Sequence, residues 1–430
     1  MRTIISALAL VSVAGFVACR DITVLEQSNP GTLEASKLYV PANAQLLVNG
    51  AISDFNCAYV RYVTGSALLS DELSNAIAGS DNYDYDGRRV RTNQAYGTAT
   101  CGNNQQPPIY TTLSRARGSA DTIISRLKSW TQAEMPATAN RERLIAQSYA
   151  YAGYSVLLLG EGMCSAAINV GPELTPAQLF EEAKMRFDSA VVYAAAVTPN
   201  TAADVAIGHF ARIGRARTFM NLAQYTDAAT DAAAIPSTFA TVNTSNDGVN
   251  ARNTNQVFHH INNSSFSTVD PSFRGLTIGG NPDPRVAVTN GNRPGTAPGS
   301  AIWTADKYPA LSTPMPIAKY AEAQLILAET SARANDLTAA ETAINNARNT
   351  RAGMPQYSAA GQTQDQVLAQ IVEERRREFF LEGHRLQDFK RFGLTLSPAP
   401  GALDVANQAY GDQVCFPLPD VERVNNPNIS

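Results

Sequence analysis

Apolar residues recur three or four positions apart over most of this chain, which is the spacing of an amphipathic α-helix. The pattern predicts helices over 34–63 (with a break near Pro41), 110–131, 139–159, 202–222, 225–234, 317–334 and 337–352. Another helix is expected to begin at Pro176 with Thr175 as its N-cap, because Thr is favoured before a helix and Pro fits its first position. Neighbouring helices form pairs with small residues at the contact, which resembles tetratricopeptide units. The sequence therefore predicts a mainly α fold of tetratricopeptide-like helical repeats.

Two long stretches lack this periodicity and are rich in Gly, Asn, Pro, Ser and Thr, at about 79–108 and 237–316. Loops of this length inside a compact chain are usually functional. We therefore expect long irregular loop insertions with little β structure, within one helical domain over 34–430.

The same two stretches contain the candidate ligand-binding residues, namely Tyr83, Tyr85, Arg88, Tyr96, Phe273 and Trp303. Aromatic rings next to guanidinium and amide donors suit a sugar ring or a peptide, whose apolar face stacks while its polar groups form hydrogen bonds. The alternatives are a plain surface loop for the first stretch and a core-packing role for Trp303. Asp81, Asp84 and Asp86 lack the ligand order of a calcium loop, and the adjacent His259-His260 pair lacks further ligands, so no metal or cofactor is predicted.

Residues 369–381 contain good helix formers and six consecutive charged residues, followed by Phe379, Phe380 and Leu381. Glu373 and Glu374 precede Arg377 by four and three positions, so both are expected to pair with it along the helix. Gly383 is expected to end this helix or to admit a close neighbour, before a second short helix. The aromatic residues beside the charges indicate a packed helix rather than a solvated one.

The run E-R-R-R-E-F-F-L-E-G-H-R-x-x-D-F-K-R-F-G closely resembles the C-terminal hallmark of the SusD/RagB family. Leu386 and Gln387 stand where the family often has an aromatic pair, and Lys319 replaces the usual Arg of an earlier family stretch that contains Glu322 and Glu329. The resemblance extends to the terminal segment Cys415-Phe-Pro-Leu-Pro. It implies structural roles for the matching motif residues, which are Glu322, Glu329, Arg375, Arg376, Glu378, Glu382, Gly383, Arg385, Asp388 and Arg391. An acid–base pair of Glu322 and Glu329 is the enzymatic alternative.

The N-terminus has a basic residue, Arg2, then an apolar run ending in Val-Ala-Cys. This predicts a lipoprotein signal peptide over 1–18, lipidation of Cys19 and a tether over 19–33. An ordinary signal peptide with an incidental Cys19 is the alternative. The remaining cysteines allow three disulfide pairings, of which we favour Cys57–Cys101 and Cys164–Cys415.

The formal net charge of −4 offers no electrostatic footprint for nucleic acid, and no phosphate loop, zinc-helix motif or nucleophile elbow is present in the sequence. The resemblance implies a surface-exposed outer-membrane lipoprotein, without enzymatic activity or cofactor. It would bind an oligosaccharide or peptide nutrient and deliver it to a partner SusC-like TonB-dependent transporter. A helical glycoside hydrolase and a protein-binding repeat scaffold are the alternatives.

Overall fold

The computed structural model describes residues 34–102, 105–247, 251–404 and 406–429. The predicted signal peptide 1–18, Cys19 and the tether 19–33 lie outside the described residues. Within the described part, none of the helices combines the length and apolar character that crossing a bilayer requires.

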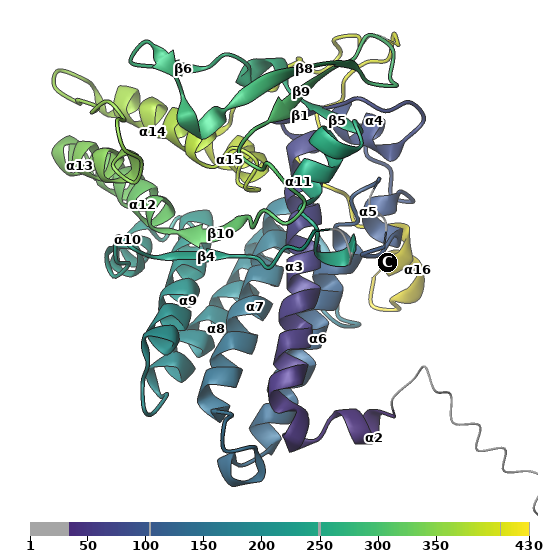
Figure 1. Ribbon diagram of the computed structural model, residues 1–430, viewed down its shortest axis with the longest axis vertical. Coiled ribbons are helices and arrows are strands. Elements are labelled where there is room, and N and C mark those ends of the chain that lie inside the picture. The colour runs from purple at the N-terminus through teal and green to yellow at the C-terminus, as the bar shows by residue number, and fades with distance from the viewer. Residues whose placement is uncertain (1–33, 103–104, 248–250, 405, 430) are drawn as a thin grey trace, which may run out of the picture.

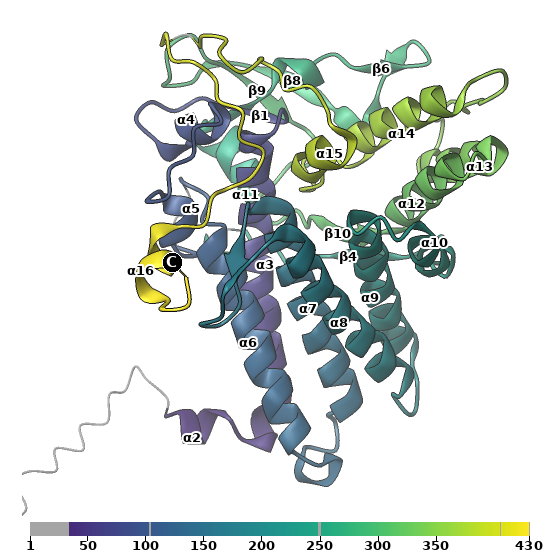
Figure 2. The same cartoon turned by 180° about the vertical axis from the view of Figure 1, so that it is seen from behind.

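The long helices form an array whose members run lengthwise beside one another (Figures 1 and 2). They are α3 (Ala44–Leu69), α6 (Tyr110–Ser129), α7 (Arg141–Gly162), α8 (Pro176–Ala195) and α9 (Ala202–Asn221). Helix α6 packs on α7, α7 on α8 and α8 on α9, so successive helical hairpins share their faces. The array continues through α10 (Tyr225–Ala233), α12 (Tyr320–Arg333), α13 (Leu337–Arg348), α14 (Gln364–Glu378) and α15 (Arg385–Phe392). The mainly α, tetratricopeptide-like architecture predicted from the sequence is confirmed.

Local sequence signals explain how the array begins its helices and packs them. Thr175 caps α8 in a reciprocal capping box with Gln178. On the buried side of the same helix, Phe187 contacts Gly153 of α7 and Gly214 of α9. A Cβ at Gly153 would lie 2.7 Å from the Phe187 ring, so the three helices approach closely only because these positions have no side chain.

The structure differs from the sequence expectation where residues 317–334 begin. Residues 316–319 form strand β10 (Pro316–Lys319), which pairs with β4 (Ala240–Val242), and the helix starts only at Tyr320. Ile317 and Ala318 are buried in this pair. A strand partner 75 or so residues away decides the backbone here, and helical spacing contains no information about such a partner.

The irregular stretches are built from very short elements. Helices α4 (Asp81–Asp86) and α5 (Ala95–Thr98) interrupt the first stretch, and α11 (Gln256–Phe258) lies in the second. In the described residues, all strands pair in two-stranded antiparallel sheets. Besides β4–β10, these pairs are β1 (Leu73–Asn75) with β5 (Ser267–Val269), β2 (Ala166–Ala167) with β3 (Glu173–Leu174), β6 (Thr277–Ile278) with β7 (Asn281–Pro282), and β8 (Val288–Pro294) with β9 (Ala301–Ala305). The prediction of little β structure is confirmed.

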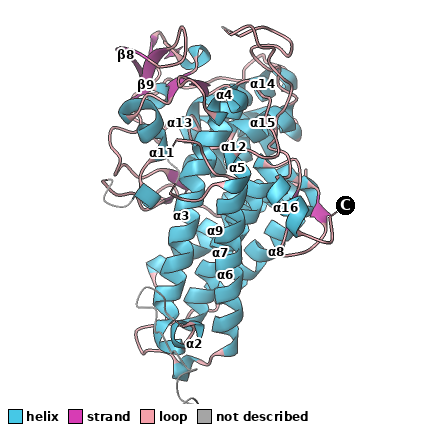
Figure 3. Cartoon of the chain, turned by 90° about the vertical axis from the view of Figure 1, so that its right-hand side faces the viewer, coloured by secondary structure: helices cyan, strands magenta, loops and turns pink. Residues whose placement is uncertain are grey.

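The two ends of the array have different characters. The short helix α2 (Ala35–Leu38), near the first described residue, lies at one end, while β1, β5, β8, β9 and α4 gather at the other (Figures 1 and 3). After α15 the chain returns along the back of the molecule to α16 (Asp420–Asn425), next to α5 (Figure 2).

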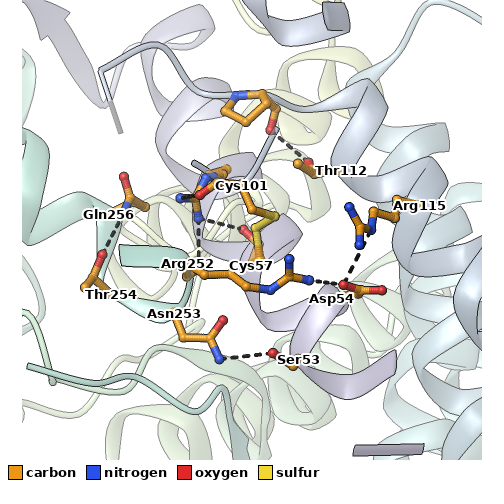
Figure 4. The surroundings of a disulfide bond; sticks show 12 residues. Ser53, Asp54, Cys57, Cys101, Thr112, Arg115, Arg252, Asn253, Thr254 and Gln256 are labelled. Atoms are coloured by element: carbon orange, nitrogen blue, oxygen red, sulfur yellow. Dashed lines mark hydrogen bonds and ion pairs between the residues drawn. A yellow bond between two sulfur atoms is a disulfide. The ribbon is translucent and has the colours of Figure 1, made fainter. Parts of the chain in front are cut away.

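Two disulfides attach loop segments to the array: Cys57–Cys101 and Cys164–Cys415, the pairing favoured from the sequence. Figure 4 shows the first, which joins the middle of α3 to the first irregular stretch. One turn earlier on α3, Asp54 binds Arg252 of the second stretch. Helix α3 is therefore the support on which both irregular stretches rest.

Candidate functional site

The charged residues of the C-terminal motif are buried and paired. Their ion pairs are Arg375–Asp388, Arg376–Glu373, Glu378–Lys319, Glu378–Arg351, Glu382–Lys307, Glu382–Lys319, Arg385–Asp71 and Arg391–Glu329. Glu72, next to Asp71, accepts a hydrogen bond of 2.7 Å from the backbone N–H of Leu381. These contacts join α14 and α15 to α12 and to the turn that follows α3, and they occupy the charged groups of the motif.

Glu322 and Glu329 do not form a catalytic pair. Glu322 lies 3.8 Å from Arg217 beside an internal cavity of about 10 Å³, which has room for one water molecule and none for a substrate. Burial raises the pKa of Glu322 to about 7. Burial also acts to raise the pKa of Glu329, but the charges of Arg391 and Arg375 outweigh it and hold that pKa below its ordinary value.

One predicted pairing within the motif is wrong. Glu373 binds Arg377 at 2.6 Å, as predicted, but Glu374 points away from Arg377 and binds Arg285 at 2.6 Å and also Arg348. Both spacings place a glutamate near the face of Arg377, but Glu374 lies on the buried side of the helix, where Arg285 and Arg348 bind it.

A cavity of about 580 Å³ lies among the short sheets. Elements α4, β1 and β5, which contribute to its lining, lie at the end of the array away from α2 (Figure 1). Four segments contribute to its wall: 74–87, 268–274, 297–301 and the C-terminal loop 398–410. This volume falls within the range of small-molecule sites. No other cavity described here combines such a size with walls from several irregular segments, so we take it as the candidate site and name it the upper pocket.

Tyr83 is the one sequence candidate that lines the upper pocket directly with an aromatic ring. Its hydroxyl donates a hydrogen bond to Oδ2 of Asp404 at 2.5 Å, and the guanidinium of Arg89 lies 4.8 Å from its ring centroid. Asp404 also accepts from the backbone N–H groups of Ala406 and Gln408. Although burial acts to raise it, these hydrogen bonds hold the pKa of Asp404 below its ordinary value.

Arg88 holds the C-terminal wall of the upper pocket, which contains Asp404 and Tyr410, in place without contacting the cavity. Its side chain is buried and donates to the backbone carbonyls of Ser397, Pro398 and Gly411. Its guanidinium lies 5.0 Å from the ring of Tyr410, which lines the pocket. Burial raises the pKa of Tyr410 to about 12, so this hydroxyl keeps its proton.

Asp86 places a carboxyl group in the pocket wall. Its Oδ2 accepts a hydrogen bond of 2.8 Å from the backbone N–H of Asn75. Burial raises the pKa of Asp86 to about 7, and the nearby Asp270 acts in the same direction, while Arg88 and Arg89 act against it. This carboxyl therefore exchanges its proton near neutral pH.

Four of the sequence candidates are packed inside the protein rather than presented to a ligand. Tyr85 and Tyr96 are fully buried and pack around Phe416, with ring centroids 5.3 Å from it. Phe273 is fully buried against Phe380 at 4.8 Å, and Arg88 is buried as described above. We correct the assignment accordingly: these aromatic rings anchor the irregular stretches to the core. The sequence alone does not distinguish an aromatic residue with this role from one that binds a ligand.

Trp303 is half-buried on β9 and lies behind the pocket wall. The guanidinium of Arg274, which does line the upper pocket, sits 5.0 Å from the Trp303 ring. One face of the ring is thus covered by Arg274, and the residue supports the wall.

Sequence reasoning missed most of the pocket residues, including Asp86, Arg274, Asp404 and Tyr410. Asp404 and Tyr410 lie in the loop that follows the C-terminal motif. The signal in this loop is Tyr410, an aromatic residue in a segment that contains Gly and Asn. In the described part of the chain, no three His, Cys, Asp or Glu side chains are grouped so as to hold a metal ion.

Residues 301–429 match the sequence profile of the SusD family. No curated protein sequence matches the chain. Among solved structures, a SusD-like carbohydrate-binding protein from Bacteroides vulgatus shares 16% identity with a TM-score of 0.66, covering 90% of this chain and 96% of that one. A SusD superfamily protein from Bacteroides fragilis shares 17% identity with a TM-score of 0.67, covering 91% of this chain and 99% of that one.

A third similar structure is surface glycan-binding protein A from Bacteroides thetaiotaomicron in complex with laminarihexaose. It shares 14% identity with a TM-score of 0.65, covering 90% of this chain and 98% of that one. At these identities the likeness concerns the fold, and it extends over almost the whole described chain.

Proposed function

Because residues 301–429 match the SusD family profile and the fold resembles SusD-like structures, we propose that this chain is a lipid-anchored SusD-like protein of the outer-membrane surface that binds an oligosaccharide in the upper pocket and delivers it to a SusC-like TonB-dependent transporter. The observation that carries the glycan-binding part is the upper pocket itself, whose wall comes from four irregular segments mounted on a rigid helical array. A rigid support of this kind keeps a binding site preorganised.

The anchoring part rests on the sequence and on where the described chain begins. Helix α2 lies at the end of the array opposite the upper pocket (Figure 3), so a lipid on Cys19 would leave the pocket directed away from the anchor. Several acyl chains on one cysteine hold a protein firmly to a membrane, since each buried methylene contributes about 0.8 kcal/mol. Incorporation of labelled fatty acid that persists in Cys19→Ser would contradict lipidation.

Glycan binding is tested by calorimetry on the detergent-solubilised full-length protein with laminarihexaose, cellopentaose and a panel of other oligosaccharides. We expect Tyr410→Ala to weaken binding of the accepted glycan by about tenfold or more, because an aromatic residue in a binding site is a common energetic hot spot. Tyr39→Ala is the matched control, since Tyr39 also lies beneath an arginine, Arg126, but next to α2. Equal losses in both variants would contradict the assignment of the upper pocket.

The absence of enzymatic activity belongs to the same proposal. Asp86 and Asp404 both line the upper pocket, and glycoside hydrolases use two carboxyl groups that flank the cleaved bond. Asp404, however, is held by Tyr83, by Arg89 and by two backbone N–H groups, so it is not free to act as a base or a nucleophile. Release of reducing ends from a bound glycan that stops in Asp86→Asn would overturn this proposal in favour of a hydrolase.

Delivery to a transporter is tested by affinity purification from the native membrane. We expect a TonB-dependent transporter to copurify with the tagged full-length protein. If only other soluble proteins copurify and no glycan binds, the repeats act as a protein-binding scaffold instead.

A further inference from the structure

The walls of the upper pocket are mostly aliphatic. Its apolar members come from all four segments and include Ile77, Pro271, Ala297, Pro298, Pro398 and Leu403. Leu403 is 64% exposed, so its side chain is open to a ligand at the pocket. These walls favour a ligand group that has apolar surface of its own.

Apart from that of Tyr410, the hydroxyl groups in the wall are already engaged as donors inside the protein. Ser74 donates to Asp270 at 2.8 Å, and Tyr83 donates to Asp404. Thr268 and Ser300 each donate to a backbone carbonyl at 2.8 Å. A ligand that fills the pocket with free hydroxyl groups would therefore find few side-chain donors and much aliphatic surface, and burying an unpaired hydroxyl group is unfavourable.

Three polar groups of the wall remain available to a ligand. Among the described residues, the Tyr410 hydroxyl, Nη1 of Arg274 and Oδ1 of Asp86 have no hydrogen-bonding partner, while the other atoms of Arg274 and Asp86 bind the backbone of Val269 and Asn75. Tyr410 and Arg274 donate at neutral pH, and Asp86 donates whenever it is protonated. Once ionised, Asp86 accepts instead, so the donors at neutral pH are Tyr410 and Arg274. These two donors suit a ligand atom that accepts hydrogen bonds, such as a carbonyl oxygen.

Resting on the proposed glycan-binding function, we propose that the upper pocket takes a short acyl group carried by a sugar, as an O-acetyl ester or an N-acetyl amide. The methyl group of the acyl contacts the aliphatic walls, and its carbonyl oxygen accepts from Tyr410 and Arg274. Acyl groups thereby distinguish the accepted glycan from the same backbone with free hydroxyl groups.

The test compares matched ligands by calorimetry on the detergent-solubilised full-length protein. One pair is acetylated xylo-oligosaccharides against the same material after alkaline deacetylation. The other is penta-N-acetylchitopentaose against cellopentaose, which share a β-1,4 backbone. We expect the acylated member of at least one pair to bind about tenfold or more tightly, since one well-placed apolar group in a pocket typically changes binding by about ten- to two-hundredfold. The pair that shows the preference tells an ester from an amide.

A matched pair of variants locates the acyl group. Leu403→Asn and Leu46→Asn replace leucines of nearly equal exposure, 64% and 63%, at opposite ends of the molecule. We expect Leu403→Asn to weaken binding of the acylated ligand by about tenfold and to change binding of the unacylated ligand little. Leu46→Asn is expected to change the binding of neither ligand. An acyl preference that survives both Leu403→Asn and Ile77→Asn would overturn its placement in the upper pocket.

The remaining outcomes separate this inference from the proposed function. Equal binding within both ligand pairs, or tighter binding of N-acetyl-trialanine amide than of every glycan, overturns the acyl preference. Binding of unacylated glycans then still supports the glycan-binding function. Absence of binding to all glycans tested overturns both.

Discussion

At positions 373 and 374 two neighbouring glutamates have opposite environments. The Glu374 side chain is 2% exposed and binds Arg285 and Arg348, whereas that of Glu373 is 35% exposed and binds Arg376 and Arg377. When a buried carboxylate is removed, water cannot reach its buried cationic partners to compensate their charge. An exposed one shares its partners with water, so its net contribution to stability is small.

We therefore predict that Glu374→Gln lowers the free energy of unfolding by about 3–5 kcal/mol, because it leaves the buried Arg348 without its anionic partner. Glu373→Gln on the same helix is the control and is expected to cost about 1 kcal/mol or less. Urea denaturation followed by circular dichroism measures both. If both variants lose a similar amount of unfolding free energy, burial does not determine how much an ion pair in this network contributes to stability.

Asp86 makes stability depend on pH in a defined direction. Its folded-state pKa, raised to about 7 by burial, lies above its ordinary value of 3.8, so the folded state holds the proton more tightly than the unfolded chain does. The stabilising contribution of the protonated group is fully present below about pH 4 and is lost as the pH rises through about 7. Asp270 faces the same carboxyl and opposes its ionisation, while Arg88 and Arg89 favour it.

We expect the unfolding free energy of the wild-type protein to fall relative to that of Asp86→Asn between about pH 4 and pH 7, and to run parallel to it above pH 8. The comparison cancels other buried acids that titrate in this range, such as Glu322. Denaturation of both proteins across this pH range is the measurement. A constant difference from pH 4 to pH 8 would contradict the raised pKa.

At the scale of elements, the end of α14 decides how the C-terminal motif meets the core. The helix stops at Glu378, and Leu381 and Gly383 then adopt positive φ angles of 56° and 78°. This turn lets α15 fold back so that Asp388 meets Arg375. A Cβ at position 383 would lie 3.1 Å from the ring of Tyr62 on α3, so glycine serves both the backbone angle and the close approach.

Gly383→Ala separates these two requirements when it is compared with Gly401→Ala. Gly401 has a similar φ of 84°, but an added Cβ there would meet nothing within 4 Å. Gly401→Ala is expected to cost about 1–2 kcal/mol from the backbone alone. Gly383→Ala is expected to cost clearly more, as measured by thermal unfolding. Equal costs would mean that Tyr62 moves aside freely.

At the scale of the whole molecule, the upper pocket depends on segments more than 300 residues apart. Its C-terminal wall, residues 398–410, lies between the motif helices and Cys415, and the Cys164–Cys415 disulfide fastens the far end of that wall to the end of α7. Tyr83, Arg88 and Arg89 hold its middle. The wall is thus tethered on both sides of the cavity.

We predict that Cys164→Ser combined with Cys415→Ser lowers the free energy of unfolding by about 2–5 kcal/mol and also weakens glycan binding in the folded protein. The control is Cys57→Ser with Cys101→Ser, which removes the disulfide on α3 (Figure 4) and is expected to lower stability with less effect on binding. Calorimetry and thermal unfolding measure the two effects. Unchanged binding in the first double variant would show that hydrogen bonds alone hold the wall.

Much of the helical frame is readable from the sequence, and the site is readable only in part. Helical periodicity placed the long helices to within a few residues, and Thr175 with Pro176 marked where α8 begins. Of the candidate ligand residues, only Tyr83 lines the upper pocket, while Tyr85, Tyr96 and Phe273 are buried. An aromatic residue in an irregular stretch serves equally well as an anchor or as a platform, and its neighbours in space decide which.

The sequence by itself determined the helical class, the motif that resembles the SusD family and the four cysteines available for pairing besides Cys19, because these depend on residue type and on short, regular spacings. Tertiary structure alone decided that residues 316–319 form a strand, that Glu374 turns to Arg285, and that Asp86, Arg274 and Tyr410 meet around one cavity. Each of these depends on a partner far away along the chain. Burial and hydrogen bonding to such partners outweigh local preference, and they exist only once the chain has folded.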